Sequence, residues 1–223
     1  MPEILDKNQK AKLFSREKRT DYLPWILMAL VLGGMIFALW FNGRIWWCKW
    51  DTPVYIATLD AWSKHTSQHF FDPYAFTHVL HGFLFLWILS LIVHTILGKK
   101  LSFAWLLFFA VFAEAAWEVV ENSQYVIEKY REQTASLDYT GDSIANSFGD
   151  ILACAFGFII AYRLKFWLTF LLFVIIETIL LITIRDNLTL NIIMLIHPIE
   201  AIKTWQTNAQ ETAQLIKILF GKT

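Results

Sequence analysis

Five apolar stretches constrain the fold of this chain more than any other feature. A helix needs about 20 predominantly apolar residues to cross the hydrocarbon core of a bilayer, and 57% of the 223 residues are apolar while only 17% are charged. This balance excludes a soluble globular, a disordered or a nucleic-acid-binding chain, and the net charge of zero provides no field that attracts polyanions. The expected spans run approximately from Leu23 to Phe41, Phe76 to Leu97, Leu101 to Val120, Ser143 to Leu164 and Phe166 to Ile184.

The pattern therefore predicts an all-α polytopic membrane protein with about five transmembrane helices. The apolar residues 188–196 are too few to span a bilayer, so we expect an interfacial or re-entrant helix near the C-terminus, with a sixth span as the alternative. The pair Asp72-Pro73 is typical of a helix start and precedes the second stretch. The chain divides into a basic N-terminal segment (1–22), a helical membrane domain (23–206) and a polar C-terminal tail (207–223).

Lysine and arginine residues indicate which ends of the spans share a side of the membrane, because positively charged flanks are retained in the cytoplasm. Basic residues precede the first stretch, and others separate the second from the third and the fourth from the fifth, as alternating spans require. The N-terminus is therefore predicted to be cytoplasmic, with the loops near residues 42–74 and 122–141 on the other side. The basic residues are Lys7, Lys10, Lys12, Arg16, Lys18, Arg19, Lys99, Lys100, Arg163 and Lys165.

Three of the apolar stretches carry polar side chains at helical spacing. Ionisable groups in a bilayer cost several kcal/mol each unless they face a polar interior, so they indicate a functional site. All of them fall at the predicted outer ends of their spans, which predicts one funnel-shaped polar cavity open to the exterior. They are His78 and His81 in the second stretch, Glu114, Glu118 and Glu121 at the end of the third, and Asp142, Asn146 and Asp150 at the start of the fourth.

This set of side chains predicts metal-assisted chemistry. Imidazole and carboxylate ligands together favour a divalent ion such as Zn, Mn or Fe, which lowers the pKa of bound water, while a nearby carboxylate can act as general acid or base. The expected reaction is hydrolysis or group transfer on a lipid or lipid-linked molecule whose head enters the cavity. The predicted metal ligands are His78, His81 and Glu114, and the predicted catalytic residues are Glu118, Glu121, Asp142, Asn146 and Asp150.

Structural interpretations of the same residues stay open at this stage. The histidines can bond to backbone carbonyls, Asp142 can cap a helix, and Glu121 can be solvated at the membrane boundary. Asn146 and Asp150 lie too deep for capping, but they can form hydrogen bonds between helices.

Five further residues lie outside the main group of candidates. Arg131 and Tyr139 are predicted to bind substrate, because an arginine beside an acidic cavity can hold a phosphate or carboxylate; the alternative is a solvated loop with ion pairs. Glu177 can pair with a neighbouring helix and is kept outside the predicted site. Cys48 and Cys154, the two cysteines, are too few for a disulfide framework or a thiolate metal site.

Several segments between residues 72 and 206 carry a specific resemblance. They read DPYAFTHVLHGF, EAAWEVVENS, YREQT, LDYTGDSIANS, RDNLTLN, PIEAI and WQ, and they resemble the bacterial family called domain of unknown function 2585. That family consists of inner-membrane proteins without an assigned activity, so the resemblance implies a bacterial inner-membrane location and no particular reaction. Gly149 departs from it, since a small polar residue is expected there. The matching positions are His78, His81, Glu114, Glu118, Glu121, Asn122, Asp142, Asn146 and Asp150.

A looser similarity to VanZ-like membrane proteins lies in the acidic helix end followed by a helix start with Asp and Asn. The first functional hypothesis is thus an inner-membrane hydrolase or transferase whose partners are membrane lipid and a lipid-linked substrate. A non-enzymatic carrier or proton-relay protein is the second, and an assembly factor for a membrane complex is the third. A polar path to the side of Lys99 and Lys100 would favour transport, whereas mutually satisfied polar groups would favour a structural role. The oligomeric state stays open.

Overall fold

The computed structural model describes residues 7–50, 55–98, 101–133 and 139–220. Within these ranges the chain forms eight α-helices, one π-helical turn and no strand beyond a single bridge between Ala57 and Phe71. The all-α prediction is confirmed. The elements are α1 (Lys7–Phe41), α2 (Ala75–Ser90), η1 (Leu91–Ile96), α3 (Phe103–Glu121), α4 (Gln124–Gln133), α5 (Ile144–Arg163), α6 (Phe166–Ile184), α7 (Leu188–Ile196) and α8 (Glu200–Phe220).

Five helices have the length and apolar composition needed to cross a membrane, as the sequence predicts. Their most apolar segments differ greatly in how much the rest of the protein covers them, from 61% in α5 to 17% in α6. An apolar helix that the protein leaves exposed is suited to face lipid. The segments are Tyr22–Phe41, Ala75–Val93, Phe103–Glu121, Ile144–Arg163 and Phe166–Ile184.

Helices α2 and α5 cross at two glycines. A Cβ atom on Gly82 would lie 2.2 Å from the carbonyl oxygen of Cys154, and one on Gly157 would lie 2.1 Å from the carbonyl oxygen of Val79. No side chain fits at these distances, so the two backbones approach each other directly. The crossing brings the first turns of α2 and α5 together with the last turns of α3.

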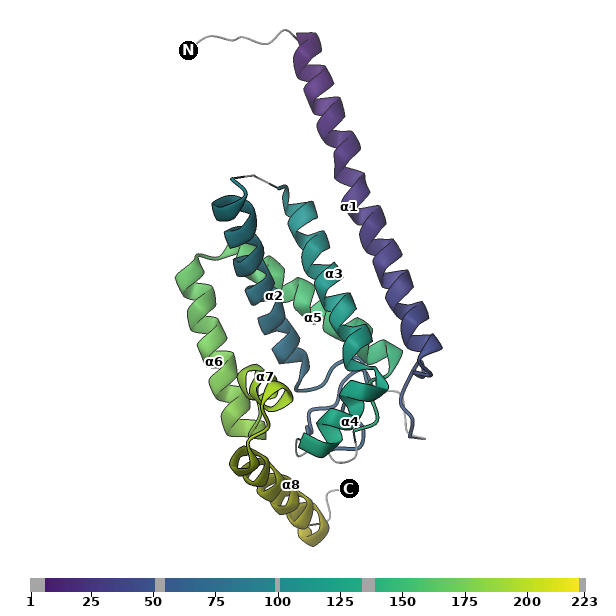
Figure 1. Cartoon of the computed structure of the whole chain (residues 1–223), viewed down its shortest axis with the longest axis vertical. Helices are drawn as coiled ribbons and strands as arrows, with labels where there is room; N and C mark the ends of the chain where they lie inside the picture. The colour runs from purple at the N-terminus through teal and green to yellow at the C-terminus, as the bar shows by residue number, and fades with distance from the viewer. Residues whose placement is uncertain (1–6, 51–54, 99–100, 134–138, 221–223) are drawn as a thin grey trace.

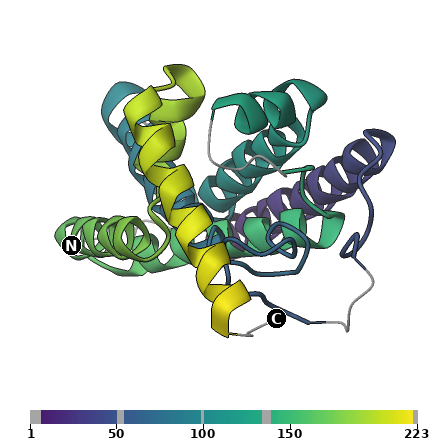
Figure 2. The ribbon, with the colours of Figure 1, turned by 90° about the horizontal axis from the view of Figure 1, so that it is seen from below.

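Different segments of the chain lie at the two ends of the helical bundle (Figure 1). The N-terminus of α1 and the α2–α3 and α5–α6 connections lie at one end. The loop before α2 and helices α4, α7 and α8 lie at the other, where α8 crosses beneath the bundle (Figure 2). Arg163 ends α5 and Lys165 precedes α6, so both lie at the same end of the bundle as the start of α1. The sequence predicts that these basic residues share one side. Lys99 and Lys100 lie outside the described residues.

Two local features differ from the sequence predictions. The expected loop 122–141 contains helix α4. Helix α2 begins only at Ala75, because Asp72 is used in the turn before it: its carboxylate accepts hydrogen bonds from the backbone N–H groups of Ser67 and Tyr74, both at 2.7 Å. The nine-residue α7 and the polar α8 are not among the five candidate spans.

Candidate functional site

His78 lies at the centre of a group of carboxylates from two other helices. It is in the first turn of α2, and its Nδ1 atom lies 2.5 Å from Oε1 of Glu114 and 3.6 Å from Oε1 of Glu118, both on α3. Its Nε2 atom lies 3.9 Å from Oδ2 of Asp150, on α5. The predicted convergence of polar residues from three membrane helices is therefore present at these four positions.

His81 joins the group through the same carboxylate. It follows His78 by three residues and lies on the same face of α2, and its Nδ1 atom is 3.1 Å and 3.0 Å from the two oxygens of Glu114. One carboxylate thus holds two imidazoles, and this contact fixes the orientation of both rings. The alternative in which the histidines bond to backbone carbonyls does not describe these contacts.

Glu118 and Asp150 carry buried oxygens that lack a hydrogen-bond donor. The exposed fraction of the residue is 0% for Glu114 and Glu118 and 4% for Asp150. Among the described residues, Oε1 and Oε2 of Glu118 and Oδ1 of Asp150 form no hydrogen bond. Buried carboxylate oxygens without donors are costly, and they are suited to bind a cation or a polar ligand.

Asp142 forms a second, adjoining group with the end of α3. Its backbone N–H donates to Oδ1 of Asn122 at 2.7 Å, and Nδ2 of Asn122 donates to its carboxylate at 2.8 Å. The hydroxyl of Tyr139 donates to the other carboxylate oxygen at 3.0 Å. Burial raises the pKa of Asp142 above its ordinary value, and these hydrogen bonds oppose the rise. The capping alternative for Asp142 is wrong, because Ser143 accepts the N-cap hydrogen bond of α5 from Asn146.

Asn146 binds the loop before α2. Its Nδ2 atom donates to the carbonyl oxygen of His69 at 2.8 Å, and its backbone N–H donates to the hydroxyl oxygen of Ser143 at 3.1 Å. Its side chain therefore anchors the loop on α5, and its described hydrogen bonds include none to the carboxylate group around His78. The polar spacing of α5 predicted its burial but could not indicate this partner.

Glu121 and the two predicted substrate-binding residues lie where α4 meets α3. Glu121 forms a hydrogen bond with Tyr130 of α4. Nε of Arg131 donates to the carbonyl oxygen of Tyr139 at 2.5 Å, so the two residues bind each other. Tyr130 and Asn122 were not predicted as site residues. Asn122 follows Glu118 by one helical turn, a spacing that marks it, whereas Tyr130 falls in a segment expected to be a loop.

Two overlapping sets around His78 have the composition of a metal site. His78, His81 and Glu114 form one set, and His78, Glu118 and Glu121 form the other. In each set, one potential ligand atom per residue lies within 4.8 Å of the others. Imidazole nitrogen and carboxylate oxygen are ligands for zinc, manganese and iron. The first set is the one predicted from the sequence as metal ligands.

These features define a polytopic helical membrane protein with a buried group of histidines and carboxylates at one end of its spans. The chain belongs to the family described as protein of unknown function (DUF2585), whose model matches residues 39–208. The family resemblance found in the sequence is thereby confirmed.

Relatives from other bacteria match most of the chain. A UPF0314 protein of Brucella anthropi is 42% identical over 191 residues, which cover 82% of this chain and 92% of the relative. A UPF0314 protein of Rhizobium meliloti is 42% identical over 197 residues, covering 85% and 94%. One of Sphingopyxis alaskensis is 39% identical over 184 residues, covering 82% and 94%. No solved structure matches the chain.

Proposed function

We propose that this protein is an inner-membrane hydrolase or transferase that uses a divalent metal ion and acts on a lipid or lipid-linked substrate. One observation carries the proposal: two histidines and three buried carboxylates from α2, α3 and α5 converge, and three of the carboxylate oxygens, on Glu118 and Asp150, lack donors among the described residues. Five ionisable side chains in one place within the spans carry a large energetic cost. A bound cation offsets that cost and supplies a reason for their convergence.

The residues divide into two roles in this proposal. His78, His81 and Glu114 hold the ion, since each offers a ligand atom in the same small volume. A divalent ion supplies a water nucleophile near neutral pH and polarises an ester or phosphoryl oxygen. Glu118 and Asp150 face His78 with uncommitted oxygens and accept the proton that the nucleophile releases.

The position of the group supports an amphiphilic substrate. It lies where α2 and α5 begin and α3 ends, at the end of the spans opposite the N-terminus (Figure 1). The exposed indoles of Trp46 and Trp50 belong to the loop at this end, and tryptophan favours the level of lipid headgroups. His81, with 15% of its side chain exposed, is the member of the group nearest to the surface on α2. With the basic residues at the other end in the cytoplasm, this site faces outward.

A carrier or proton relay fits the chain less well. Such a function needs polar groups along the whole path through the membrane. Beyond the site, α3 has only apolar side chains from Phe103 to Ala113, and between Ile151 and Ala161 the one polar side chain of α5 is Cys154. On α3 and α5 the polar group therefore ends partway through the span, as an active site does.

Metal analysis of the purified protein tests the first half of the proposal. Wild-type protein in lipid nanodiscs is expected to lose one equivalent of bound zinc when His78 and His81 are both replaced by alanine. Glu177→Gln is the matched control, because Glu177 is another buried carboxylate within a span but lies outside the group. Equal metal content in the wild type and the double variant would reject the metal site.

Mass spectrometry of the surrounding lipid tests the second half. Metal-loaded protein in nanodiscs made from a total bacterial lipid extract is expected to release new lipid products, and Glu118→Gln is expected to abolish their formation. Metal bound at His78 and His81 with no lipid product in either protein would reject the enzymatic function while keeping the metal site.

A further inference from the structure

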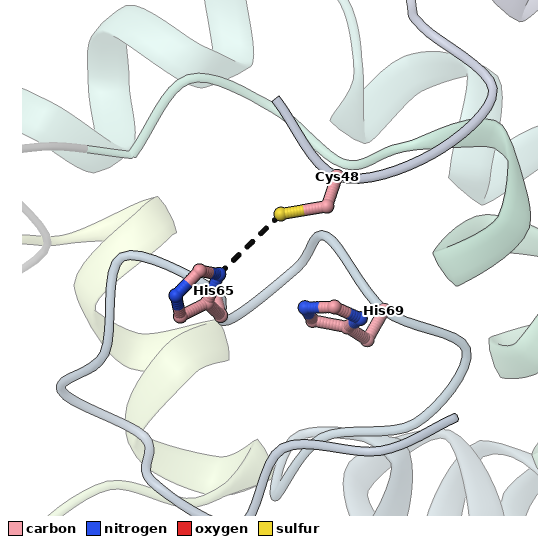
Figure 3. A group of neighbouring side chains, drawn as sticks. All are labelled: Cys48, His65 and His69. Carbon is pink, nitrogen blue, oxygen red and sulfur yellow. Dashed lines mark hydrogen bonds between the residues drawn. The ribbon is translucent and has the colours of Figure 1, made fainter. Parts of the chain in front are cut away.

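A second group of metal-binding side chains lies outside the spans, in the loop that connects α1 to α2. Cys48 comes from the first part of this loop, and His65 and His69 come from the part that returns toward α2. The three side chains point toward one another (Figure 3). One potential ligand atom from each lies within 4.8 Å of the other two. No helical or strand periodicity relates these positions, so only the folded loop brings them together.

The measured separation of sulfur and nitrogen matches a tetrahedral metal site. Sγ of Cys48 lies 3.4 Å from Nδ1 of His65. Ligands at about 2.3 Å for Zn–S and about 2.0 Å for Zn–N, arranged tetrahedrally, are separated by roughly 3.5 Å. The pair therefore fits around one zinc ion with almost no movement of either side chain.

His69 supplies the second, independent indication of a ligand. The residue has an exposed fraction of 0%, and its Nδ1 atom lies 2.8 Å from the carbonyl oxygen of Tyr55. A carbonyl only accepts, so Nδ1 donates to it, and in the neutral ring Nε2 then holds the lone pair. Nε2 is buried and has no hydrogen-bond partner among the described residues. This is the arrangement in which metal-binding histidines occur, with one nitrogen bound to a carbonyl and the other directed at the ion.

We propose that Cys48, His65 and His69 form a second metal site that binds zinc(II). Thiolate and imidazole together select a zinc-type ion over magnesium or calcium, which prefer oxygen ligands. Three protein ligands leave a fourth tetrahedral position for water or a further ligand. The site is independent of the group around His78, whose proposed ligands are imidazoles and carboxylates. It also revises the expectation that two cysteines are too few for a thiolate metal site, because here one thiolate combines with two imidazoles.

The loop that carries this site is hydrogen-bonded to the start of α5, so a metal ion in the loop would also stabilise its position on α5. The carbonyl oxygens of Ile45 and Trp46 accept hydrogen bonds from the backbone N–H groups of Ile144 and Ala145, at 2.8 Å and 3.2 Å. From the returning part of the loop, the carbonyl oxygen of His69 accepts from Asn146. A zinc ion at Cys48, His65 and His69 joins the two parts and so fixes the loop above the helix that carries Asp150.

Zinc stoichiometry and cobalt spectroscopy on the full chain test this site. Protein purified in detergent, stripped with chelator and reloaded under a non-chelating reductant is expected to bind one equivalent of zinc fewer after Cys48→Ser. His69→Asn is expected to lose the same equivalent, because an asparagine amide can keep the hydrogen bond to Tyr55 but has no second nitrogen. Circular dichroism and size-exclusion chromatography establish that each variant is folded.

Cobalt(II) identifies the sulfur ligand. Cobalt-loaded wild-type protein is expected to show a sulfur-to-cobalt charge-transfer band that Cys48→Ser abolishes. Cys154→Ser is the matched control, since it replaces the other cysteine, in α5, and is expected to keep the band. Wild-type zinc content in folded Cys48→Ser and His69→Asn, no thiolate band in the wild type, or a band that depends on Cys154 would each overturn the proposal. The double alanine variant of His78 and His81 is expected to keep the band, so failure of the membrane site is distinguishable from failure of this one.

Discussion

Two regions at the same end of the molecule bury acidic side chains, and they do so differently. In the region of α2, α3 and α5, both oxygens of Glu118 lack donors among the described residues. In the region of α6 and α7, Glu177 is also buried, but its oxygens accept hydrogen bonds from the backbone N–H groups of Leu188 at 2.9 Å and Thr189 at 3.1 Å, and from the Thr189 hydroxyl. The second carboxylate therefore satisfies the first turn of α7.

The comparison separates an acid whose charge the chain compensates from acids for which the proposed function supplies the compensation. A carboxylate at a helix N-terminus is stabilised by unpaired N–H groups and by the helix dipole, which offsets the cost of burial. Backbone N–H groups of α7 donate to both oxygens of Glu177. Both oxygens of Glu118 and one oxygen of Asp150 form no hydrogen bond among the described residues. Burial of an acidic residue in a membrane helix therefore does not by itself indicate a site, because the chain can compensate the charge as it does at Glu177.

The largest expected effect concerns metal affinity. We predict that Glu114→Gln weakens zinc binding at the membrane site by about 100-fold or more, because the amide no longer provides a charged ligand between His78 and His81. Glu177→Gln is expected to leave the affinity unchanged. A competition titration against a chelator measures both. Similar affinities for the two variants would remove the distinction between the regions.

The second prediction concerns the close crossing that assembles the first region. Gly82→Ala places a Cβ atom against the backbone of α5, so the helices must separate, and we expect a loss of about 2 kcal/mol in the free energy of unfolding. Gly33→Ala on α1 is the control, because among the described residues no atom beyond its own helical turn lies within 4 Å of its Cβ position. Denaturation in mixed micelles measures the difference, and equal stability of the two variants would contradict the packing.

The third prediction tests the structural assignment of the second region. Asn187 is the N-cap of α7 and accepts a hydrogen bond from the backbone N–H of Leu190 at 2.8 Å. Replacing it with alanine is expected to cost about 1 kcal/mol of stability, with no change in zinc content. A loss of bound zinc in folded Asn187→Ala protein would show that the two regions are coupled.

The smallest effect is a pH dependence in the same region. Burial raises the pKa of Asp186 from 3.8 to about 7, against hydrogen bonds from Asn187, Tyr74 and Gln206. The folded state thus holds the proton more tightly than the unfolded state, so this contribution to stability is complete below pH 3.8 and is lost as the pH rises through 7. Because Asp186 is only partly buried, we expect about 1 kcal/mol between pH 5 and 8.

Asp186→Asn removes the titrating group and is expected to abolish this slope. Unfolding measured at pH 5, 6, 7 and 8 gives the comparison. A slope that persists unchanged in the variant would assign the pH dependence to another group.

Helical spacing explains why much of the first region could be predicted from the sequence. A residue that recurs every three or four positions in an apolar helix must share a face with its partners, and alternating spans determine which helix ends meet. His78, Glu114, Glu118 and Asp150 were predicted to converge for these reasons. Contacts made by irregular backbone have no such period, so the binding of Asn146 to the loop could not be predicted.

The same reason explains why the sequence did not indicate the proposed site in the loop before α2. Cys48 and His65 are 17 residues apart in a segment without regular structure, and only the folding of that segment onto α5 brings them together. Helix α4 was missed for a different reason: its residues are mostly polar, and a short polar helix is difficult to distinguish from a loop by hydrophobic periodicity. Tyr130, which binds Glu121, was missed with it.

Zinc X-ray absorption of Cys48→Ser protein, which lacks the sulfur ligand of the loop site, tests the membrane site most directly. Loaded with one equivalent of zinc, this protein is expected to show nitrogen and oxygen ligands with the outer-shell scattering of imidazole. That scattering is expected to disappear when His78 and His81 are also replaced by alanine. A spectrum of bound zinc without imidazole, or the same imidazole scattering after both histidines are removed, would contradict a metal site built from α2, α3 and α5.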